Sequence, residues 1–232
     1  MICQCVSNKI KERYDNVYIY LLDINKEMTN AWQKYFRNIN NVEIINDDFA
    51  HFMNTHPNIE AVVSPANAYG LMDGGYDGAI TRYFGEELQH KVQNIIAKEW
   101  YGEQPVGTSL TVLTDKAVAN SHKLIRLIHT PTMRSPEAII DPRIVYQCMR
   151  TTLIEAEKQD VHSIVIPAFG GLCGQVPCKQ LAEYMYLAYE QFVTFVPHNI
   201  TWQDAMDTQK KLQWVMTSQK VRDMVNLVKG VE

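Results

Sequence analysis

Short apolar runs alternate with segments of helical periodicity along most of the chain. The runs are rich in β-branched and aromatic residues, as buried strands are, and lie at residues 17–22, 42–45, 61–63, 108–113, 124–129 and 163–166. Helices are predicted where apolar residues recur three or four positions apart, at about 26–39, 49–52, 77–98, 141–157 and 179–193. Strands that alternate with helices in this way predict a mostly parallel sheet covered by helices on both faces.

Polar residues at several predicted helix starts have the character of caps. Asn25 or Thr29 can cap the first helix, and Asp141, followed by Pro142, can cap the fourth. Thr201 can cap a further helix near the C-terminus.

The C-terminal segment, 198–232, stands apart from this alternating pattern. Its apolar residues fall into two groups, Trp202, Ala205, Met206, Leu212 and Met216 and then Val221, Met224, Leu227 and Val228. We expect two helices packed as an appendage on the edge of a single domain, 1–232, whose core spans 14–197. A role of the appendage in binding a protein partner, or as a lid, is the alternative.

The strongest candidate chemistry lies in residues 61–79, which read AVVSPANAYGLMDGGYDGA. A buried strand ends in SPAN, a glycine-rich loop follows, and Asp77 opens a helical pattern. Glycines let the backbone approach a ligand closely, and the free N–H groups of a first helical turn favour an anion. Open α/β sheets place their ligand chemistry at such strand ends. The stretch therefore predicts a phosphate site.

A second loop, in residues 163–174, has the same arrangement of strand, glycines and helix. It reads SIVIPAFGGLCG, an apolar strand followed by glycines, and a helix follows from about residue 177. Two glycine-bearing loops after two strands could hold the two ends of one diphosphate.

Composition and charge narrow the class of protein. The chain has 232 residues, of which 46% are hydrophobic, enough for a sizeable core. A formal net charge of -4 without a basic face argues against direct binding of nucleic acid. No apolar run approaches the ~20 residues of a membrane span, and the N-terminus lacks the apolar core of a secretion signal. We expect a cytoplasmic protein, with the nucleus as an alternative.

Cysteine usage agrees with a reducing compartment. The five cysteines are an odd number, and without a secretion signal free thiols are expected. The spacings Cys3-x-Cys5 and Cys173-x4-Cys178 differ from those of usual zinc sites, so no metal is predicted.

The two loops resemble those of macrodomains. VVSPANAYGLMDGGYDGAI is similar to the first ligand loop of that family, a strand followed by NAAN, a run of glycines and VDGAI. SIVIPAFGGLCG is similar to the second loop, while VEIINDDF and LIRLIHTP resemble two further strands. The four blocks stand in family order across about residues 42–193. The resemblance implies a three-layer α/β/α fold with a mostly parallel mixed sheet that binds ADP-ribose. The strand and helix at 17–37 would then be an added edge strand with its crossover helix.

The resemblance also implies how the adenine is bound. Asp48 would accept a hydrogen bond from the adenine 6-amino group, since a carboxylate suits an NH2 donor. Phe49 would line the adenine pocket. Neighbouring Asp47 is the alternative match, and as a purely structural alternative Asp48 caps the turn that follows.

For the distal ribose, the resemblance implies Asn67 and Asp77. The Asn67 amide would hold ribose hydroxyls, and Asp77 would orient the ribose or activate water. Both have local alternatives, because asparagine favours turns and an aspartate at a helix start is a good cap. The other implied ligand contacts of the two loops, largely through backbone N–H groups, are Ala66, Gly74, Gly75, Tyr76, Phe169, Gly170, Gly171, Leu172, Cys173 and Gly174.

Three departures from the family pattern leave the exact ligand open. Ser64 stands where the family has the first asparagine of NAAN, and Cys173 where it often has Tyr or Phe. Phe169 and Gly170 replace a small residue and a threonine, which removes a hydroxyl near the phosphates. No histidine is placed beside Cys173 by sequence, which argues against a catalytic cysteine.

The resemblance implies a hydrolase acting on ADP-ribosyl conjugates, an ADP-ribose ester or a 1''-phosphate, without a metal or cofactor. Asn67 and Asp77 would be its catalytic residues, and its partner would be ADP-ribose or an ADP-ribosylated acceptor. The departures favour the alternative of a non-catalytic reader of ADP-ribose or a related nucleotide. A module that sequesters a nucleotide signal is a further alternative.

Overall fold

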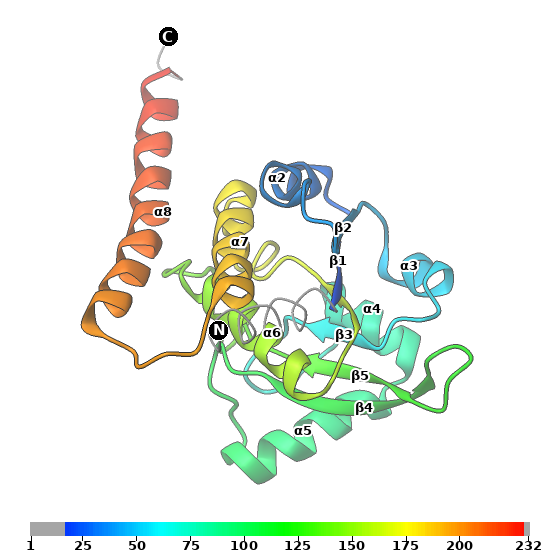
Figure 1. The fold of residues 1–232 in the computed structure, drawn as a ribbon. Helices are drawn as coiled ribbons and strands as arrows, with labels where there is room; N and C mark the ends of the chain where they lie inside the picture. Colours follow the sequence, from blue (N-terminus) through cyan, green and yellow to red (C-terminus); the bar gives the residue numbers. More distant parts are fainter. Residues whose placement is uncertain (1–16, 230–232) are drawn as a thin grey trace.

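The computed structural model describes residues 17–229, with side chains described up to residue 219. The strands are β1 (Tyr18–Leu22), β2 (Val42–Ile45), β3 (Ala61–Ser64), β4 (Leu110–Ala117), β5 (Leu124–His129) and β6 (Ser163–Ile166). The helices are α2 (Lys26–Phe36), α3 (Phe49–Thr55), α4 (Gly75–Phe84), α5 (Glu87–Trp100), α6 (Ile144–Lys158), α7 (Cys178–Thr194) and α8 (Trp202–Lys229). Figure 1 shows their arrangement.

The six strands form one sheet in the order β2-β1-β6-β3-β5-β4. All neighbouring pairs are parallel except β4 and β5, which are antiparallel. The predicted mostly parallel sheet is therefore confirmed. The parallel strands turn their carboxyl ends toward the same edge, so the loops after β1, β3 and β6 leave the sheet on one side.

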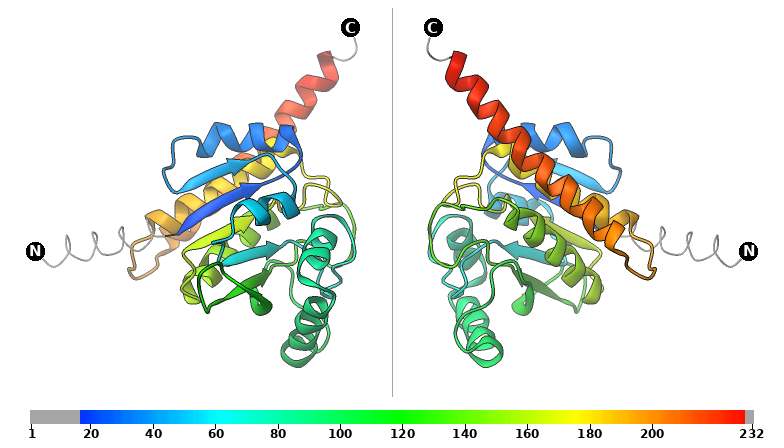
Figure 2. Two further views of the ribbon diagram at one scale, coloured as in Figure 1. Left: turned by 90° about the vertical axis from the view of Figure 1, so that its right-hand side faces the viewer. Right: turned by 90° about the vertical axis from the view of Figure 1, so that its left-hand side faces the viewer.

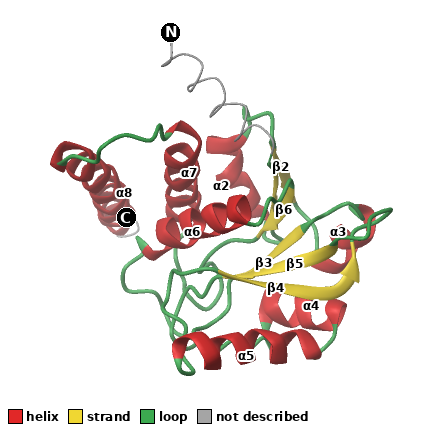
Figure 3. Ribbon diagram, turned by 60° about the horizontal axis from the view of Figure 1, so that its bottom comes forward, coloured by secondary structure: helices red, strands yellow, loops and turns green. Residues whose placement is uncertain are grey.

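Helices cover both faces of the sheet, as Figure 3 shows. One hydrophobic cluster joins α2, α6 and α7 to side chains such as Ile19, Val63 and Ile164. A second cluster joins α3, α4 and α5 to the opposite face, through side chains such as Val62 and Val165. Alternate residues of β1, β3 and β6 belong to the two clusters, as the two-residue period of a strand requires. The predicted three-layer α/β/α fold is confirmed.

The N-terminal strand is present but does not lie at the edge, so that expectation was wrong. β1 pairs with β2 on one side and with β6 on the other. Leu21 and Leu22 are fully buried, whereas β2 is only partly buried and exposes Glu43. The more apolar strand therefore takes the interior position, and the shorter, more polar strand takes the edge.

The single long helix expected at 77–98 is in fact two helices. α4 ends at Phe84, and Gly85 follows with φ +98°, its N–H donating to the carbonyl of Thr81 at 2.8 Å. A positive φ at glycine ends a helix without steric cost. α5 then begins at Glu87, so apolar periodicity on both sides of the glycine concealed the break.

Two other helix starts refine the expected caps. Asn25 caps α2, and its side-chain oxygen accepts from the N–H of Glu27 at 2.9 Å. α6 begins at Ile144, three residues after the expected cap. The Asp141 carboxylate instead accepts from the backbone N–H and the guanidinium of Arg143.

The two apolar groups of the C-terminal segment lie on one continuous helix, α8, rather than on two. It lies beside α7 and then projects beyond the rest of the molecule (Figure 2). Val215 is buried against the core, and the Tyr184 hydroxyl of α7 donates to the carbonyl of Leu212 at 3.3 Å. Trp202 and Met206, which we expected to pack, are exposed. Binding of a partner by this helix stays a prediction.

Some expectations concern features outside the described residues. Cys3, Cys5 and the start of the chain lie there, as does the beginning of the predicted core at residue 14. None of the helices within 17–229 combines the length and apolar character that crossing a bilayer requires.

Candidate functional site

The two glycine loops lie side by side at one edge of the sheet. They follow β3 and β6, which are adjacent and parallel. A Cβ placed on Gly75 would lie 3.4 Å from Cδ2 of Leu172, so the loops are in contact there. Leu172 is otherwise exposed. The chain thus brings together two segments that lie about a hundred residues apart, as their positions after neighbouring strands predict.

Asn67 holds the first loop in shape through its side chain. Its Oδ1 accepts from the N–H groups of Tyr69 and Leu71 at 3.1 and 3.2 Å, and its Nδ2 donates to the Leu71 carbonyl at 2.8 Å. The residue is 8% exposed. Asn67 therefore performs the turn-forming role that we considered as the alternative, and its role toward a ribose stays a prediction.

Asp77 lies in the first turn of α4 and points toward β3. The helix begins at Gly75 with Gly74 as its cap, two residues earlier than expected, so Asp77 is not the cap. Its Oδ1 accepts a hydrogen bond from the Ser64 hydroxyl at 2.7 Å. Burial, partly offset by that hydrogen bond, raises the pKa of Asp77 to about 7. The carboxyl group is thus held in one orientation and changes its charge near neutral pH.

Tyr76, next to Asp77, points in a different direction, toward α3. Its ring packs edge-on against Phe49, with 5.3 Å between the ring centroids and 70° between the planes. Its hydroxyl is buried and has no hydrogen-bond partner among the described residues. The side chains of Tyr76 and Asp77 therefore contact different elements, α3 and β3, at the start of α4.

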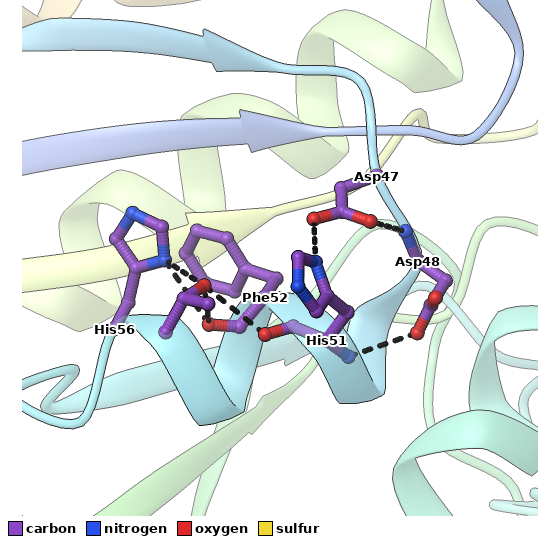
Figure 4. A network of polar contacts seen from close by, with 6 residues as sticks. Asp47, Asp48, His51, Phe52 and His56 are labelled. Carbon is purple, nitrogen blue, oxygen red and sulfur yellow. Dashed lines mark hydrogen bonds and ion pairs between the residues drawn. The ribbon is translucent and has the colours of Figure 1, made fainter.

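The acidic pair after β2 is tied to α3, as Figure 4 shows. Asp48 caps the helix, since its Oδ1 accepts from the N–H of His51 at 2.9 Å. Asp47 accepts from the N–H of Asp48 at 2.8 Å and forms an ion pair with the His51 ring, which lowers the pKa of Asp47. Asp48 has the capping role that we considered as the alternative, and contact with adenine stays a prediction.

The second loop is closed tightly around its glycines. Gly170 has φ +81°, and a Cβ there would lie 2.4 Å from Cδ1 of Ile139. A Cβ on Gly174 would lie 2.5 Å from the Gly170 carbonyl oxygen. The Gly174 carbonyl accepts from the N–H of Ile139 at 2.9 Å. A side chain at Gly170 would be strained by the positive φ, and one at Gly174 would force the backbone to shift, so both positions favour glycine.

Phe169 and Cys173 lie on opposite sides of this loop. Phe169 is fully buried in the cluster of α2, α6 and α7, so its side chain is part of the core. A ligand contact at Phe169 would have to come from its main chain. Cys173 is an exposed free thiol.

A family model described as Macro domain matches residues 63–185. The matched region is more than half of the chain and includes both glycine loops. The chain belongs to the Macro domain family. The match begins at Val63, so it covers Asn67 and Asp77, whereas Asp48 lies before it.

Two bacterial proteins are among the relatives of this macrodomain protein. An uncharacterized protein of Aquifex aeolicus is 30% identical over 138 residues, which cover 60% of this chain and 77% of that protein. The O-acetyl-ADP-ribose deacetylase of Salmonella typhimurium is 29% identical over 142 residues, covering 60% of this chain and 75% of the deacetylase.

Solved macrodomain structures share the fold at low sequence identity. The Oceanobacillus iheyensis macrodomain with ADP has a TM-score of 0.50 and 21% identity, over 69% of this chain and 86% of the other. A mutant of that macrodomain with ADPR gives the same TM-score of 0.50 over 68% of this chain and 87% of the other. The likeness confirms the fold of the macrodomain core.

Sequence reasoning missed two polar residues at the strand ends of this macrodomain. Ser64, noted only as a departure from NAAN, is fully buried and orients Asp77. Asp23 follows β1 and is partly buried, and burial raises its pKa. Its Oδ1 accepts from the N–H of Asn25 at 2.8 Å. A polar residue at the end of a buried strand, or directly after it, was the available signal for both.

The macrodomain core holds a further buried ring close to Ser64. His129 of β5 pairs with Ser64 of β3, and its Nδ1 lies 2.7 Å from Oε1 of Gln104. Burial lowers the pKa of His129 to about 3, so the ring is neutral near pH 7. This histidine therefore places no positive charge beside the Asp77 carboxyl. Among the described residues, no group of three His, Cys, Asp or Glu side chains is placed to hold a metal ion.

Proposed function

We propose that this protein binds ADP-ribose and hydrolyses an ADP-ribosyl derivative, either a mono-ADP-ribosylated acceptor or an ester or 1''-phosphate of ADP-ribose. The observation that carries the proposal is the Asp77 carboxyl group, held by Ser64 at 2.7 Å in the first turn of α4. It lies two residues after Gly75, where the first glycine loop meets Leu172 of the second. The names of the deacetylase relatives support hydrolysis of such a compound.

The site supports this chemistry through positioning. The N–H groups of the two loops and of the first turn of α4 would bind the diphosphate, since a helix N-terminus favours anions. Asp77, once ionised, would orient a water molecule toward the distal ribose linkage with help from the substrate phosphate. Loop N–H groups would stabilise the developing charge. The scheme uses no metal or cofactor.

Calorimetric titration with ADP-ribose tests the binding step. We expect binding to the wild-type protein, weaker binding of AMP and NAD, and loss of ADP-ribose affinity in Asp48→Ala. Because Asp48 also caps α3, the Asp48→Asn variant serves as the control, since its amide oxygen keeps the acceptor for the cap. Absence of ADP-ribose binding by the wild-type protein would overturn the proposed function.

Removing the Ser64 hydroxyl should move the pH dependence of turnover. The hydrogen bond from Ser64 lowers the pKa of Asp77, so Ser64→Ala should raise that pKa further above about 7. If the ionised carboxylate is the active form, the rise of kcat with pH shifts to higher pH in Ser64→Ala. Turnover then falls at pH 7 and recovers in more alkaline solution.

The matched control for this change is Ser64→Thr, which keeps the hydroxyl. A pH profile of Ser64→Ala identical to that of the wild type would contradict a role of Ser64 in positioning Asp77. A uniform loss of kcat at every pH would indicate a general disturbance of the strand end instead.

A non-catalytic reader of ADP-ribose is the second candidate. The observation that favours it is the Asn67 amide, whose oxygen and one N–H are engaged with the loop backbone. The exposed thiol of Cys173, where the family often has an aromatic ring, agrees with it. Binding of ADP-ribose without turnover of ester, phosphate and protein conjugates would support the reader.

A further inference from the structure

α8 carries apolar side chains on two opposite faces. Its inner face packs on the domain, where Val215 is buried and Leu212 joins the cluster of α2, α6 and α7. At 3.6 residues per turn, Met206 and Trp214 fall on the other side of the helix, and they are 52% and 70% exposed. α8 also projects beyond the domain (Figure 2), so a second helix has room to lie along this outer face.

A hollow of about 330 Å³ runs along the outer face of α8. It is lined by Met206, Gln209, Lys210, Gln213, Trp214 and Thr217. The first four of these residues are spaced i, i+3, i+4 and i+7. Four residues in that arrangement form the hole that receives one side chain of a facing helix in a coiled coil. The hollow therefore has the shape that accepts a large side chain from a second helix.

We propose that the outer face of α8 pairs with the same face of a second copy of this chain, with the two helices antiparallel. A two-fold interface requires a self-complementary patch, in which residue i of one copy meets residue j of the other and the reverse. The outer face carries both a large exposed side chain, Trp214, and the hole between Met206 and Gln213. When the pair is centred between residues 211 and 212, each Trp214 meets the hole of the other copy.

The same register accounts for the other exposed side chains of the helix. Met206 of one copy lies opposite Thr217 of the other, so both ends of the hollow are covered. Trp202, which is 87% exposed, lies opposite position 221, a valine in the sequence. α8 continues to Lys229, so the helix is long enough for this pairing.

Charge decides between the two directions of pairing. Lys210 lies in the middle of the outer face and forms an ion pair with Asp207 of its own helix, with 3.5 Å between Nζ and Oδ1. Parallel helices in register would place the two Lys210 ammonium groups opposite each other, where like charges repel. In the antiparallel pair each Lys210 faces Gln213 and Trp214 of the other copy, and a cation beside an indole ring is favourable.

Sedimentation analysis of the full chain over a range of concentrations tests the pairing. We expect a reversible dimer with twice the chain mass of 26.7 kDa. Trp214→Ala should raise the dissociation constant of the dimer more than tenfold, because each dimer loses two tryptophans from the centre of the interface. Trp214 is 70% exposed, so the variant should keep the fold and the melting temperature of the monomer.

Ile140→Ala is the matched control for Trp214→Ala. Ile140 is an apolar side chain outside α8 and is 99% exposed. We expect this variant to dimerise as the wild type does.

Oxidative cross-linking tests the direction of pairing. The double variant Met206→Cys/Thr217→Cys should form disulfide-linked dimers, because residue 206 of one copy faces residue 217 of the other. Thr217→Cys alone should give no more covalent dimer than the wild type. In the antiparallel pair the two copies of residue 217 lie about 16 Å apart along the helices, too far for a disulfide.

Each failure has a distinct meaning. A wild-type protein that stays monomeric at every concentration would overturn the inference and leave the outer face of α8 to a helix of another protein. A dimer that Trp214→Ala leaves intact, or that Ile140→Ala dissociates, would place the interface elsewhere and overturn it as well. Efficient cross-linking of Thr217→Cys alone would indicate parallel helices and contradict the antiparallel arrangement.

Discussion

Replacing Asp77 by asparagine is expected to lower the turnover of an ADP-ribosyl ester at least 10²-fold, the usual contribution of a positioned acid or base. Asparagine keeps the shape of the side chain and can still accept from the Ser64 hydroxyl, which lies 2.7 Å from Oδ1 in the wild type. It cannot take a proton from water. The affinity for ADP-ribose should therefore stay within about threefold, and the loss should appear in kcat rather than in binding.

The pH dependence of stability gives a second, independent readout of this variant. The pKa of Asp77 is raised from 3.8 to about 7 in the folded protein. Between pH 3.8 and about 7, Asp77 holds a proton in the folded protein but releases it in the unfolded chain. The free energy of unfolding therefore falls as the pH rises through this range. Asp77→Asn removes this contribution. The variant should therefore lose less stability than the wild type when the pH rises from about 4 to about 7.

Asp73→Asn is the matched control for Asp77→Asn. Asp73 lies in the same loop and its side chain is exposed, and its charge raises the pKa of Asp77. Its replacement should leave maximal turnover unchanged and lower the pH at which half of it is reached. Turnover equal to that of the wild type in Asp77→Asn would contradict the catalytic role. A loss of ADP-ribose affinity as large as the loss of turnover would assign Asp77 to binding instead.

The parts of the site that sequence alone predicted are those with local signals. A buried strand followed by glycines is recognisable within about a dozen residues, and both loops were found in this way. The hydrogen bond between Ser64 and Asp77 could not be predicted, because it depends on how α4 folds back on β3. The burial of the Tyr76 hydroxyl, which has no hydrogen-bond partner within the described part of the chain, likewise depends on the packing of α3 against α4.

The errors in the fold have a common physical cause. The order of strands in a sheet is decided by tertiary packing, so the apolar character of β1 indicated that it is buried but not that it lies between β2 and β6. The apolar residues of α8 suggested burial of Trp202 and Met206, which are exposed. Periodicity predicts that a helix forms, but the surface available on the rest of the domain decides how much of it is buried.

Replacing Gly174 by alanine should damage the second loop severely. The added Cβ would lie 2.5 Å from the Gly170 carbonyl oxygen and 2.6 Å from Cδ1 of Ile139. The nearest atom belongs to the backbone, so the loop itself must shift. Such overpacking costs about 1–3 kcal/mol of stability, which corresponds to a fall of roughly 2–12 °C in melting temperature. Displaced N–H groups would also lower the affinity for ADP-ribose, by about tenfold or more.

Gly74→Ala distinguishes a steric effect from a general intolerance of the glycine loops. Gly74 caps α4 in an extended conformation, and a Cβ there would have no atom within 4 Å. This variant should lose at most a few tenths to about 1 kcal/mol of stability, through the weaker cap. If Gly174→Ala matched Gly74→Ala in stability and kept the wild-type affinity for ADP-ribose, the backbone of the second loop would be free to adjust. The N–H groups of that loop would then not be a preformed binding surface for the diphosphate.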